Sequence, residues 1–281
     1  MGSAVIAELL SAGHQVLALA RSESAARRLT TLGAVVLRGG LEDNEALQAG
    51  VEQCDAVVHL AFNSDYTKFE ETCATDERAI NVIGEAIART NKSFVVPNGL
   101  AGLAPGRIVT EDDDIPADYP FPRRSEQLAL KLASEGVNAM VVRLSQVHST
   151  ATQGLVTGLI PLAQQSGVSG YVGEGANRWP AVHISDAARL FRLALERPER
   201  GARFHAVAEE GLEMRVIAEV IGRLACVPTR SFTSEEGRPH FGMLGMFVEQ
   251  DMPASSALTR SRMQWQPAGP DLVHDLERSR I

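Results

Sequence analysis

The sequence predicts an α/β protein with a doubly wound parallel sheet and a smaller C-terminal lobe. Three observations support this class. Short apolar runs alternate with amphipathic helical segments through the first 150 residues. The links between them are short, so neighbouring strands can pair in parallel only through helical crossovers. The expected strands are apolar on both faces, as strands covered by helices on each side must be.

The first helix and strand show how the elements are assigned. Val5, Ile6 and Leu9 recur at helical spacing, and Gly13 follows them as a C-cap glycine does. The segment 14–21 is a short apolar run with polar ends, which is typical of a buried strand. The cycle then repeats, with helices expected at 22–33, 42–53, 66–90 and 123–136 and strands at 34–39, 55–62, 92–98 and 137–147.

The alternation loosens beyond residue 150, so we expect two parts of different character. Residues 1–150 carry most of the sheet, and residues 151–281 add its last elements and a small lobe. The helix at 185–198 is strongly amphipathic and ends at a proline. Further elements are expected as helices at 154–167 and 214–225, a strand at 203–208, and a glycine-rich loop with a short strand at 170–183, whereas 229–253 shows no clear period.

Composition excludes several classes of protein. The formal charge is -8 and the pI near 5.4, with basic residues interspersed among acids, so nucleic acid is not expected as a partner. The three cysteines have no metal-ligand or CxxC spacing, which fits a reduced, cytoplasmic compartment. No apolar run approaches the roughly 20 residues that span a bilayer. Glu8 and the lack of a preceding basic residue argue against a signal peptide.

The chain opens on a helix where a Rossmann-type fold opens on a strand and a glycine turn. In such folds the turn G-x-G-x-x-G brings backbone N–H groups and a helix N-terminus against a pyrophosphate. The first helix and its succeeding strand match the elements that come directly after that turn, so Gly2 would be its last glycine. We therefore expect a truncated start that lacks the central strand of the sheet. The alternative is that Gly2 only begins a helix.

The ordered motifs resemble an extended or atypical short-chain dehydrogenase/reductase of the NAD-dependent epimerase/dehydratase superfamily. These motifs cover residues 2 to about 225. Each is weak by itself, but their order and spacing together are specific for this superfamily. The matching pieces are "GSAVIAELLSAGHQVLALAR", "AVVLRGGLEDNEAL", "CDAVVHLAF", "GEAIA…KSFVV", "VVRLSQVH" and "RWPAVHISDAARLFRLALE". The resemblance implies that 1–150 binds NAD(P) and that the remainder contacts a substrate.

The resemblance also places candidate cofactor contacts. Arg21 stands where an acidic residue would bind the adenosine ribose of NAD, and arginine can instead pair with a 2′-phosphate. Arg21 with Ser22 therefore favours NADP, with NAD as the alternative. Leu41 would lie alongside the adenine, and Ala61 and Phe62 beneath the nicotinamide ribose. Solvated or crevice-lining roles for these residues are the competing interpretation.

The catalytic pattern of the superfamily is not found in its usual form. That pattern is Tyr-x-x-x-Lys with an upstream Ser or Thr, in which the lysine lowers the tyrosine pKa. The natural alignment places Pro122 at the tyrosine and Glu126 at the lysine, and Asn98 near the hydroxyl position. Tyr119 and Arg123 have the right spacing for a shifted pair, although prolines between them disfavour a helix. The competing interpretation is a surface loop.

His183 is a further candidate, in the segment where family members place substrate-facing residues. Its imidazole could transfer protons near neutral pH. A buried structural hydrogen bond is the equal alternative for His183, and Trp179 is expected in the core. Spacing of the histidines predicts no metal site.

Two functions are implied by the resemblance. The first is an NAD(P)-dependent oxidoreductase or epimerase that acts on a small carbonyl or alcohol by hydride transfer. The second is a catalytically degenerate NAD(P)-binding sensor or regulatory protein, favoured by the replaced catalytic residues. Because family members often pair through helices equivalent to 66–90 and 125–135, a homodimer is compatible with either function.

Overall fold

The computed structural model describes residues 1–63, 68–88, 90–104 and 106–279. The chain forms two compact units, each assembled from separate stretches of sequence. Unit 1 comprises Met1–Asn98, Pro120–Arg143 and Ala188–Phe204. Unit 2 comprises Gly99–Tyr119, Leu144–Ala187 and His205–Ile281.

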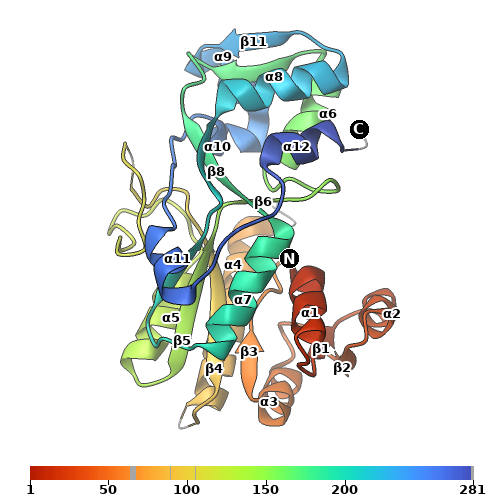
Figure 1. The fold of residues 1–281 in the computed structure, drawn as a ribbon, viewed down its shortest axis with the longest axis vertical. Coiled ribbons are helices and arrows are strands. Elements are labelled where there is room, and N and C mark those ends of the chain that lie inside the picture. The colour runs from red at the N-terminus through yellow and green to blue at the C-terminus, as the bar shows by residue number, and fades with distance from the viewer. Residues whose placement is uncertain (64–67, 89, 105, 280–281) are drawn as a thin grey trace. The chain divides into compact units, whose positions relative to one another are not determined.

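Unit 1 alternates helices and strands as predicted (Figure 1). Its elements are α1 (Gly2–Ser11), β1 (Leu17–Ala20), α2 (Glu23–Thr31), β2 (Val35–Arg38), α3 (Asn44–Gln53), β3 (Ala56–Val58), α4 (Phe69–Ile87), β4 (Ser93–Gly99), α5 (Ser125–Ser134), β5 (Asn138–Leu144), α7 (Ile184–Glu196) and β9 (Arg203–Ala206). The helix predicted at 66–90 is thus α4, and positions 66, 67 and 89 lie outside the described residues.

The strands of unit 1 form two sheets. β1 pairs in parallel with β2, with Leu17 opposite Val35. β3 pairs in parallel with β4, with Ala56 opposite Ser93, and the larger sheet has the order β3-β4-β5-β9. This arrangement confirms the predicted α/β class with parallel strands. Within the described residues no ladder joins β1 to β3.

Helices cover the larger sheet on both faces. On one face, α4 and α5 pack against Phe94 and Val96 of β4, which are fully buried. In Figure 1, α7 crosses in front of the strands and α4 lies behind them. On the α7 side, Nε of Arg192 donates to Glu8 of α1 at 2.7 Å, which ties α1 to α7. The side chains of β4 are therefore buried on both faces of the sheet, as the sequence predicts.

Two predicted strands differ from the observed ones. The apolar run 55–62 forms a strand only over Ala56–Val58. The backbone N–H of His59 still donates to the carbonyl of Val95 in β4 at 2.9 Å, and the residues after it lie beyond the end of the strand. The run 137–147 breaks at Ser145 into β5 and a separate strand, β6 (Gln146–His148). β2 is also less buried than predicted, since Val35 is 65% exposed.

Unit 2 holds shorter elements. They are β6, α6 (Val156–Ser166), β7 (Ser169–Val172), β8 (Arg178–His183), β10 (Glu209–Glu213), α8 (Met214–Ala225), β11 (Thr229–Phe232), α9 (Ser234–Phe241), the 3-10 helix η2 (Gly242–Leu244), α10 (Gly245–Val248), α11 (Ala257–Met263) and α12 (Leu272–Glu277). β8 is central in the sheet β10-β8-β6, and β7 pairs in parallel with β11. The glycine-rich segment 170–183 therefore supplies two strands rather than a loop with one.

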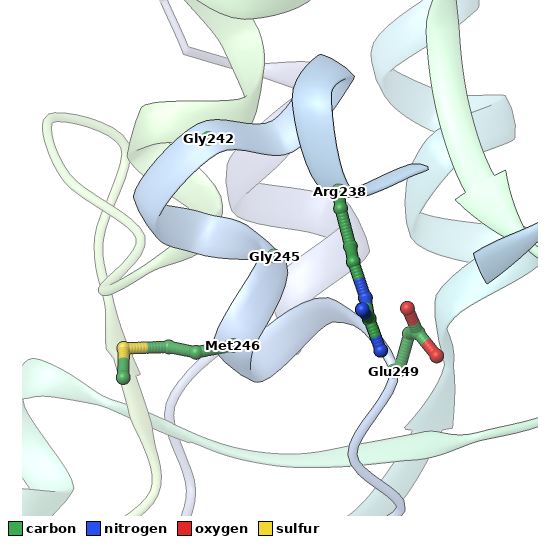
Figure 2. A pocket seen from close by; sticks show the side chains of 5 residues that line it. All are labelled: Arg238, Gly242, Gly245, Met246 and Glu249. Atoms are coloured by element: carbon green, nitrogen blue, oxygen red, sulfur yellow. The ribbon is translucent and has the colours of Figure 1, made fainter. Parts of the chain in front are cut away.

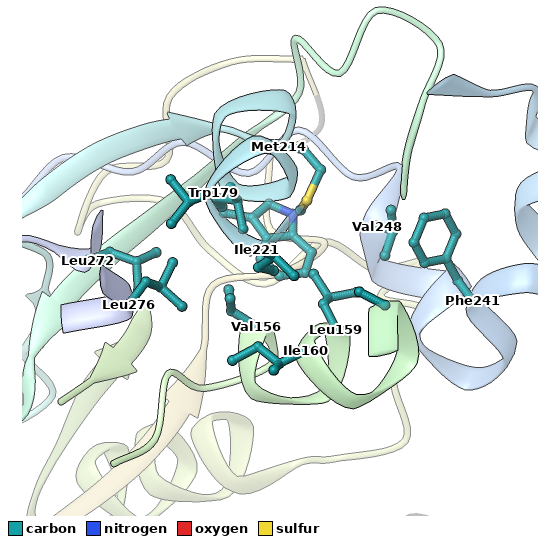
Figure 3. Close-up of a cluster of buried hydrophobic side chains, with 14 of the residues drawn as sticks. Val156, Leu159, Ile160, Trp179, Met214, Ile221, Phe241, Val248, Leu272 and Leu276 are labelled. Carbon is teal, nitrogen blue, oxygen red and sulfur yellow. The ribbon is translucent and has the colours of Figure 1, made fainter. Parts of the chain in front are cut away.

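Trp179 lies at the centre of the unit 2 core, as predicted. Its side chain is fully buried among Val156, Met214 and Ile221, and Figure 3 shows these residues converging from β8, α6 and α8. The chain around α12 closes the other side through Leu272 and its neighbours. Burying a side chain of this size contributes several kcal/mol by area, so the core holds the lobe together.

The segment 229–253 folds into short helices with a mixed surface. Phe241 is buried in the unit 2 core, but Met243 and Met246 are each 52% exposed, so only part of this segment packs in the core. A hollow of about 340 Å³ lies in this segment. Its lining residues, shown in Figure 2, are Arg238, Gly242, Gly245, Met246 and Glu249. Among the described residues no helix is long and apolar enough to cross a bilayer.

Candidate functional site

The candidate site lies at the carboxyl ends of the strands in unit 1. Arg21 follows β1, Leu41 follows β2 after two glycines, Phe62 follows β3, and Asn98 lies at the end of β4. In open α/β sheets ligands bind outside the carboxyl ends of parallel strands. The fold therefore places these four residues at the carboxyl ends of strands, Arg21 and Leu41 in the β1-β2 sheet and Phe62 and Asn98 in the β3-β4-β5-β9 sheet.

Leu41 borders a hollow in unit 1 of about 250 Å³. The hollow lies between the turn after β2 and α4, and its lining residues are Leu41, Glu42, Asn44, Arg78, Asn81, Val82 and Glu85. The turn leading to it needs glycine at position 39, because its φ is +152° and a Cβ there would lie 2.5 Å from that of Ala46. The hollow offers apolar contacts from Leu41 and Val82 beside the amide of Asn81, a combination that suits a flat heterocyclic ring.

Arg21 and Ser22 stand at the end of β1. The Arg21 side chain is exposed and has no ion pair among the described residues. Ser22 caps α2, since its Oγ accepts from the backbone N–H of Ala25 at 3.2 Å. The neighbouring Arg38 is paired with Glu23. Of these two arginines, Arg21 is the one whose guanidinium is available to a ligand at the end of β1.

The other predicted cofactor contacts differ in their surroundings. Gly2 is the first residue of α1, and a Cβ there would meet nothing within 4 Å. Ala61 is exposed. Phe62 is half-buried, with its ring edge-to-face to Phe69 at 6.2 Å and the guanidinium carbon of Arg123 at 4.3 Å from its centroid.

A buried polar cluster lies beneath Phe62 that sequence reasoning missed. Nε2 of His59 donates to Oδ1 of Asp76 at 2.7 Å. The Ser125 hydroxyl donates to Oδ2 of the same carboxylate and accepts from Nε of Arg123 at 2.7 Å. His59, Asp76 and Ser125 are each at most 3% exposed. Because an ionised carboxylate can only accept, both His59 Nε2 and the Ser125 hydroxyl donate to Asp76.

Asp76 is ionised despite its burial. Burial by itself raises the pKa of a carboxyl group, but hydrogen bonds from His59 and Ser125 and the charge of Arg123 outweigh it. The pKa of Asp76 is consequently below its ordinary value. The negative charge of Asp76 therefore faces the guanidinium of Arg123, 3.5 Å from its Nε.

Glu126 forms a second buried cluster at the position that the alignment gives to the catalytic lysine. It is fully buried, and its carboxylate accepts from Nε of Arg143 at 2.9 Å and from Nε of Arg203 at 3.1 Å. Nδ2 of Asn98 donates to the same carboxylate at 2.9 Å. The amide of Asn98 is thus engaged with Glu126, and this carboxylate is committed to two arginines.

The structure does not bring Tyr119 and Arg123 into one unit. Tyr119 lies in a turn of unit 2, half-buried against the cluster of Leu100 and Val109. Arg123 belongs to unit 1, where it contacts Phe62, Asp76 and Ser125. Their shared catalytic role stays a prediction.

His183 belongs to a histidine–carboxylate cluster in unit 2. Its Nδ1 lies 2.7 Å from the Ser185 hydroxyl, and its Nε2 lies 3.7 Å from Asp275. The same carboxylate is 2.7 Å from Nδ1 of His148, which is fully buried. Burial lowers the pKa of His148 despite its bond to Asp275, so this imidazole is neutral at pH 7. His183 is the more accessible of the two, and its role in proton transfer stays a prediction.

A pattern in the sequence could have revealed both buried carboxylates. Asp76 lies on the stripe Thr72, Cys73, Ala79, Ile80 of α4, and Glu126 is one turn before Ala129 on the inward face of α5. An acid on the apolar stripe of a helix requires a buried partner. Among the described residues no group of three or more His, Cys, Asp or Glu could hold a metal ion.

The parallel α/β arrangement of unit 1 defines a Rossmann-type fold. The model of the NAD dependent epimerase/dehydratase family matches residues 1–208, and the chain belongs to that family. It is 43% identical to uncharacterized protein C2A9.02 of Schizosaccharomyces pombe over 98% of this chain and 94% of the relative. It is 41% identical to uncharacterized protein YLL056C of Saccharomyces cerevisiae, with the same shares covered.

Solved structures share the fold at low identity. One is a dTDP-glucose 4,6-dehydratase from Streptomyces venezuelae determined with NAD bound. It has a TM-score of 0.76 at 16% identity, and the match covers 99% of this chain and 92% of that one. This likeness confirms the predicted fold class.

Replacing Asp76 tests the ionised state of the first cluster. Asp76→Asn should lower the free energy of unfolding at pH 7 by about 2–4 kcal/mol, because Arg123 loses its carboxylate. Because the folded pKa is depressed, this contribution is present above the unfolded pKa of about 3.9 and is lost as pH falls through the folded value. Urea unfolding between pH 7 and about pH 3 should show the two proteins converging on acidification.

The control is Asp55→Asn, which changes an exposed carboxylate of unit 1 and should leave the unfolding free energy within about 0.5 kcal/mol. A constant difference between wild type and Asp76→Asn down to about pH 3 would show that Asp76 is not ionised through these contacts.

Proposed function

We propose that this chain is an NAD(P)-dependent oxidoreductase that acts on a small carbonyl or alcohol and favours NADP. The observation that carries the proposal is the hollow beside Leu41, between the turn after β2 and helix α4 in unit 1. Family membership supports the cofactor class, and the S. venezuelae dehydratase has NAD bound. When bound, the nicotinamide supplies or accepts the hydride.

The residues present fit such a cofactor. Leu41 and Val82 offer apolar walls for the adenine, and Asn81 offers an amide for its ring nitrogens. Arg21 stands exposed at the end of β1, where its guanidinium suits a 2′-phosphate. Ala61 and Phe62 extend the same edge toward the end of β3. We propose that unit 1 binds the cofactor and that unit 2 contributes to substrate binding.

Proton transfer needs a group other than the usual tyrosine. Glu126 is committed to Arg143 and Arg203, and Asn98 to Glu126, so neither is poised as an acid. Tyr119 and His183, both half-buried in unit 2, are the candidates. We propose that one of these two side chains transfers the proton.

The second candidate is a regulatory protein that binds NAD(P) without turning over a substrate. The burial of Glu126 between Arg143 and Arg203 favours this second candidate. The catalytic lysine of the family would be a third cation beside these two arginines, so the surroundings of position 126 suit a carboxylate rather than the catalytic lysine. The two candidates share cofactor binding and differ in turnover.

Arg21→Ala tests the cofactor preference. We expect the Kd for NADPH to rise about tenfold or more, because a charge-assisted phosphate contact contributes about 1.5–3 kcal/mol, whereas the Kd for NADH should stay within about twofold. Fluorescence titration with both nucleotides measures this. Arg27→Ala, which changes an exposed arginine of the following helix α2, is the matched control.

These titrations are run on the 281-residue chain and on the product of any longer reading frame that continues it upstream. If neither binds NADPH or NADH, the proposed function is wrong. If Arg21→Ala leaves NADPH binding unchanged, the preference for NADP is wrong.

Tyr119→Phe and His183→Gln separate the enzyme from the sensor. NADPH oxidation is followed with a panel of small aldehydes and ketones, and loss of a general acid should lower kcat by about 10²–10⁴-fold while the Kd for NADPH is unchanged. Tyr171→Phe, another half-buried tyrosine of unit 2, is the control. Turnover unaffected by both variants would remove Tyr119 and His183 from the chemistry, and absence of turnover with intact NADPH binding would favour the sensor.

A further inference from the structure

Arg123 is held in one position by contacts on two of its sides. Its Nε donates to the Ser125 hydroxyl at 2.7 Å and lies 3.5 Å from Oδ2 of Asp76. Its guanidinium carbon lies 4.3 Å from the centroid of the Phe62 ring, within the range of a cation–π contact. The side chain is 21% exposed, so one part of the group remains open.

The two residues that contact Arg123 through polar atoms, Asp76 and Ser125, are themselves held by hydrogen bonds. Asp76 uses Oδ1 for His59 and Oδ2 for Ser125, and both carboxylate and hydroxyl are 1% exposed. Since Ser125 donates its only proton to Asp76, its oxygen is free to accept from Arg123. The guanidinium is thus fixed before any ligand arrives, which lowers the entropic cost of binding.

The outer part of the guanidinium has unused donors. Nη1 and Nη2 make no hydrogen bond among the described residues, while Nε is the atom facing Ser125 and Asp76. Stacking on Phe62 occupies a face of the group and leaves the in-plane N–H bonds free. A planar fork with two free nitrogens matches a carboxylate or phosphate.

We propose that Arg123 binds an anionic oxygen group, a carboxylate or a phosphate, of the ligand at this edge, and that His59, Asp76, Ser125 and Phe62 are positioning residues for it. The inference rests on the proposed function in taking the carboxyl edge of unit 1 as the ligand site. It deepens that function by giving the substrate an anionic group. A phosphate of the cofactor is the other source of the same chemistry, and the experiment separates the two.

The test is an NMR titration of the arginine side chains in the ¹⁵N-labelled full chain. Inorganic phosphate and oxalate are added at constant ionic strength, first without cofactor and then with saturating NADPH. The Arg123 Nε resonance should shift saturably at millimolar anion, and the Arg124 resonance should not. Arg124 is the adjacent, exposed arginine, so Arg124→Gln is the matched control.

Phosphate binding to the variants is measured from the chemical shifts of the backbone amides of Phe62 and Ser125, because the Arg123 resonance is lost when that residue is replaced. Arg123→Gln should weaken phosphate binding about tenfold or more, Arg123→Lys should retain part of it, and Arg124→Gln should stay within about twofold. The midpoint of thermal unfolding is recorded for each variant. If Arg123→Gln does not fold, Arg123→Lys decides, because it keeps the positive charge while losing the fork.

The outcomes separate this inference from the proposed function. Phosphate binding that persists with NADPH assigns the anion to the substrate, and binding abolished by NADPH assigns it to the cofactor. An Arg123 resonance that does not move up to about 50 mM of either anion overturns the inference, as does equal weakening by Arg124→Gln. Failure of wild type to bind NADPH overturns the proposed function instead, because the first titration contains no cofactor.

Discussion

The carboxyl edge of unit 1 depends on the buried ion pair between Glu126 and Arg143. Both side chains are fully buried, and the carboxylate also accepts from Arg203 and Asn98. These four residues come from α5, β5, β9 and the end of β4, so one carboxylate joins a helix to three neighbouring strands. A buried charge without partners costs several kcal/mol, which makes each member depend on the others.

The second carboxylate, Asp76, extends this support to the end of β3. It binds His59 where the strand leaves the ladder and Ser125 where α5 begins. Asp76 thus binds Ser125, and Glu126, the next residue at the start of α5, binds the strands. Glu126 and Asn98, which the resemblance aligns with the lysine and the hydroxyl residue, are here engaged in buried hydrogen bonds, and Arg123 is 21% exposed beside them in the chain.

Periodicity in the sequence was sufficient to predict the α/β class and most elements of unit 1. The apolar stripes of α1, α3 and α4 and the runs at β4 and β5 are local, so they can be read without the fold. The break at Ser145 and the early end of β3 at Val58 could not, because both depend on which neighbour a strand pairs with. β10 and β11 were missed for the same reason, since their residues are mostly polar or exposed.

The site was predictable only where one residue acts alone. Arg21 directly follows β1, and Leu41 follows β2 after two glycines, so their places at the strand ends could be predicted from order along the chain. The pairs His59–Asp76 and Glu126–Arg203 lie 17 and 77 residues apart, and only the packed helices bring them together. Asn98 was placed correctly at the end of β4, but its engagement with Glu126 requires the structure.

The most direct test of this account is the effect of Glu126→Gln on the free energy of unfolding at pH 7. We predict a loss of about 3–5 kcal/mol, because Arg143 would remain buried without its carboxylate. Glu135→Gln, at the exposed end of the same helix, should cost less than about 0.5 kcal/mol. A loss below about 1 kcal/mol for Glu126→Gln would contradict the central place given to this ion pair.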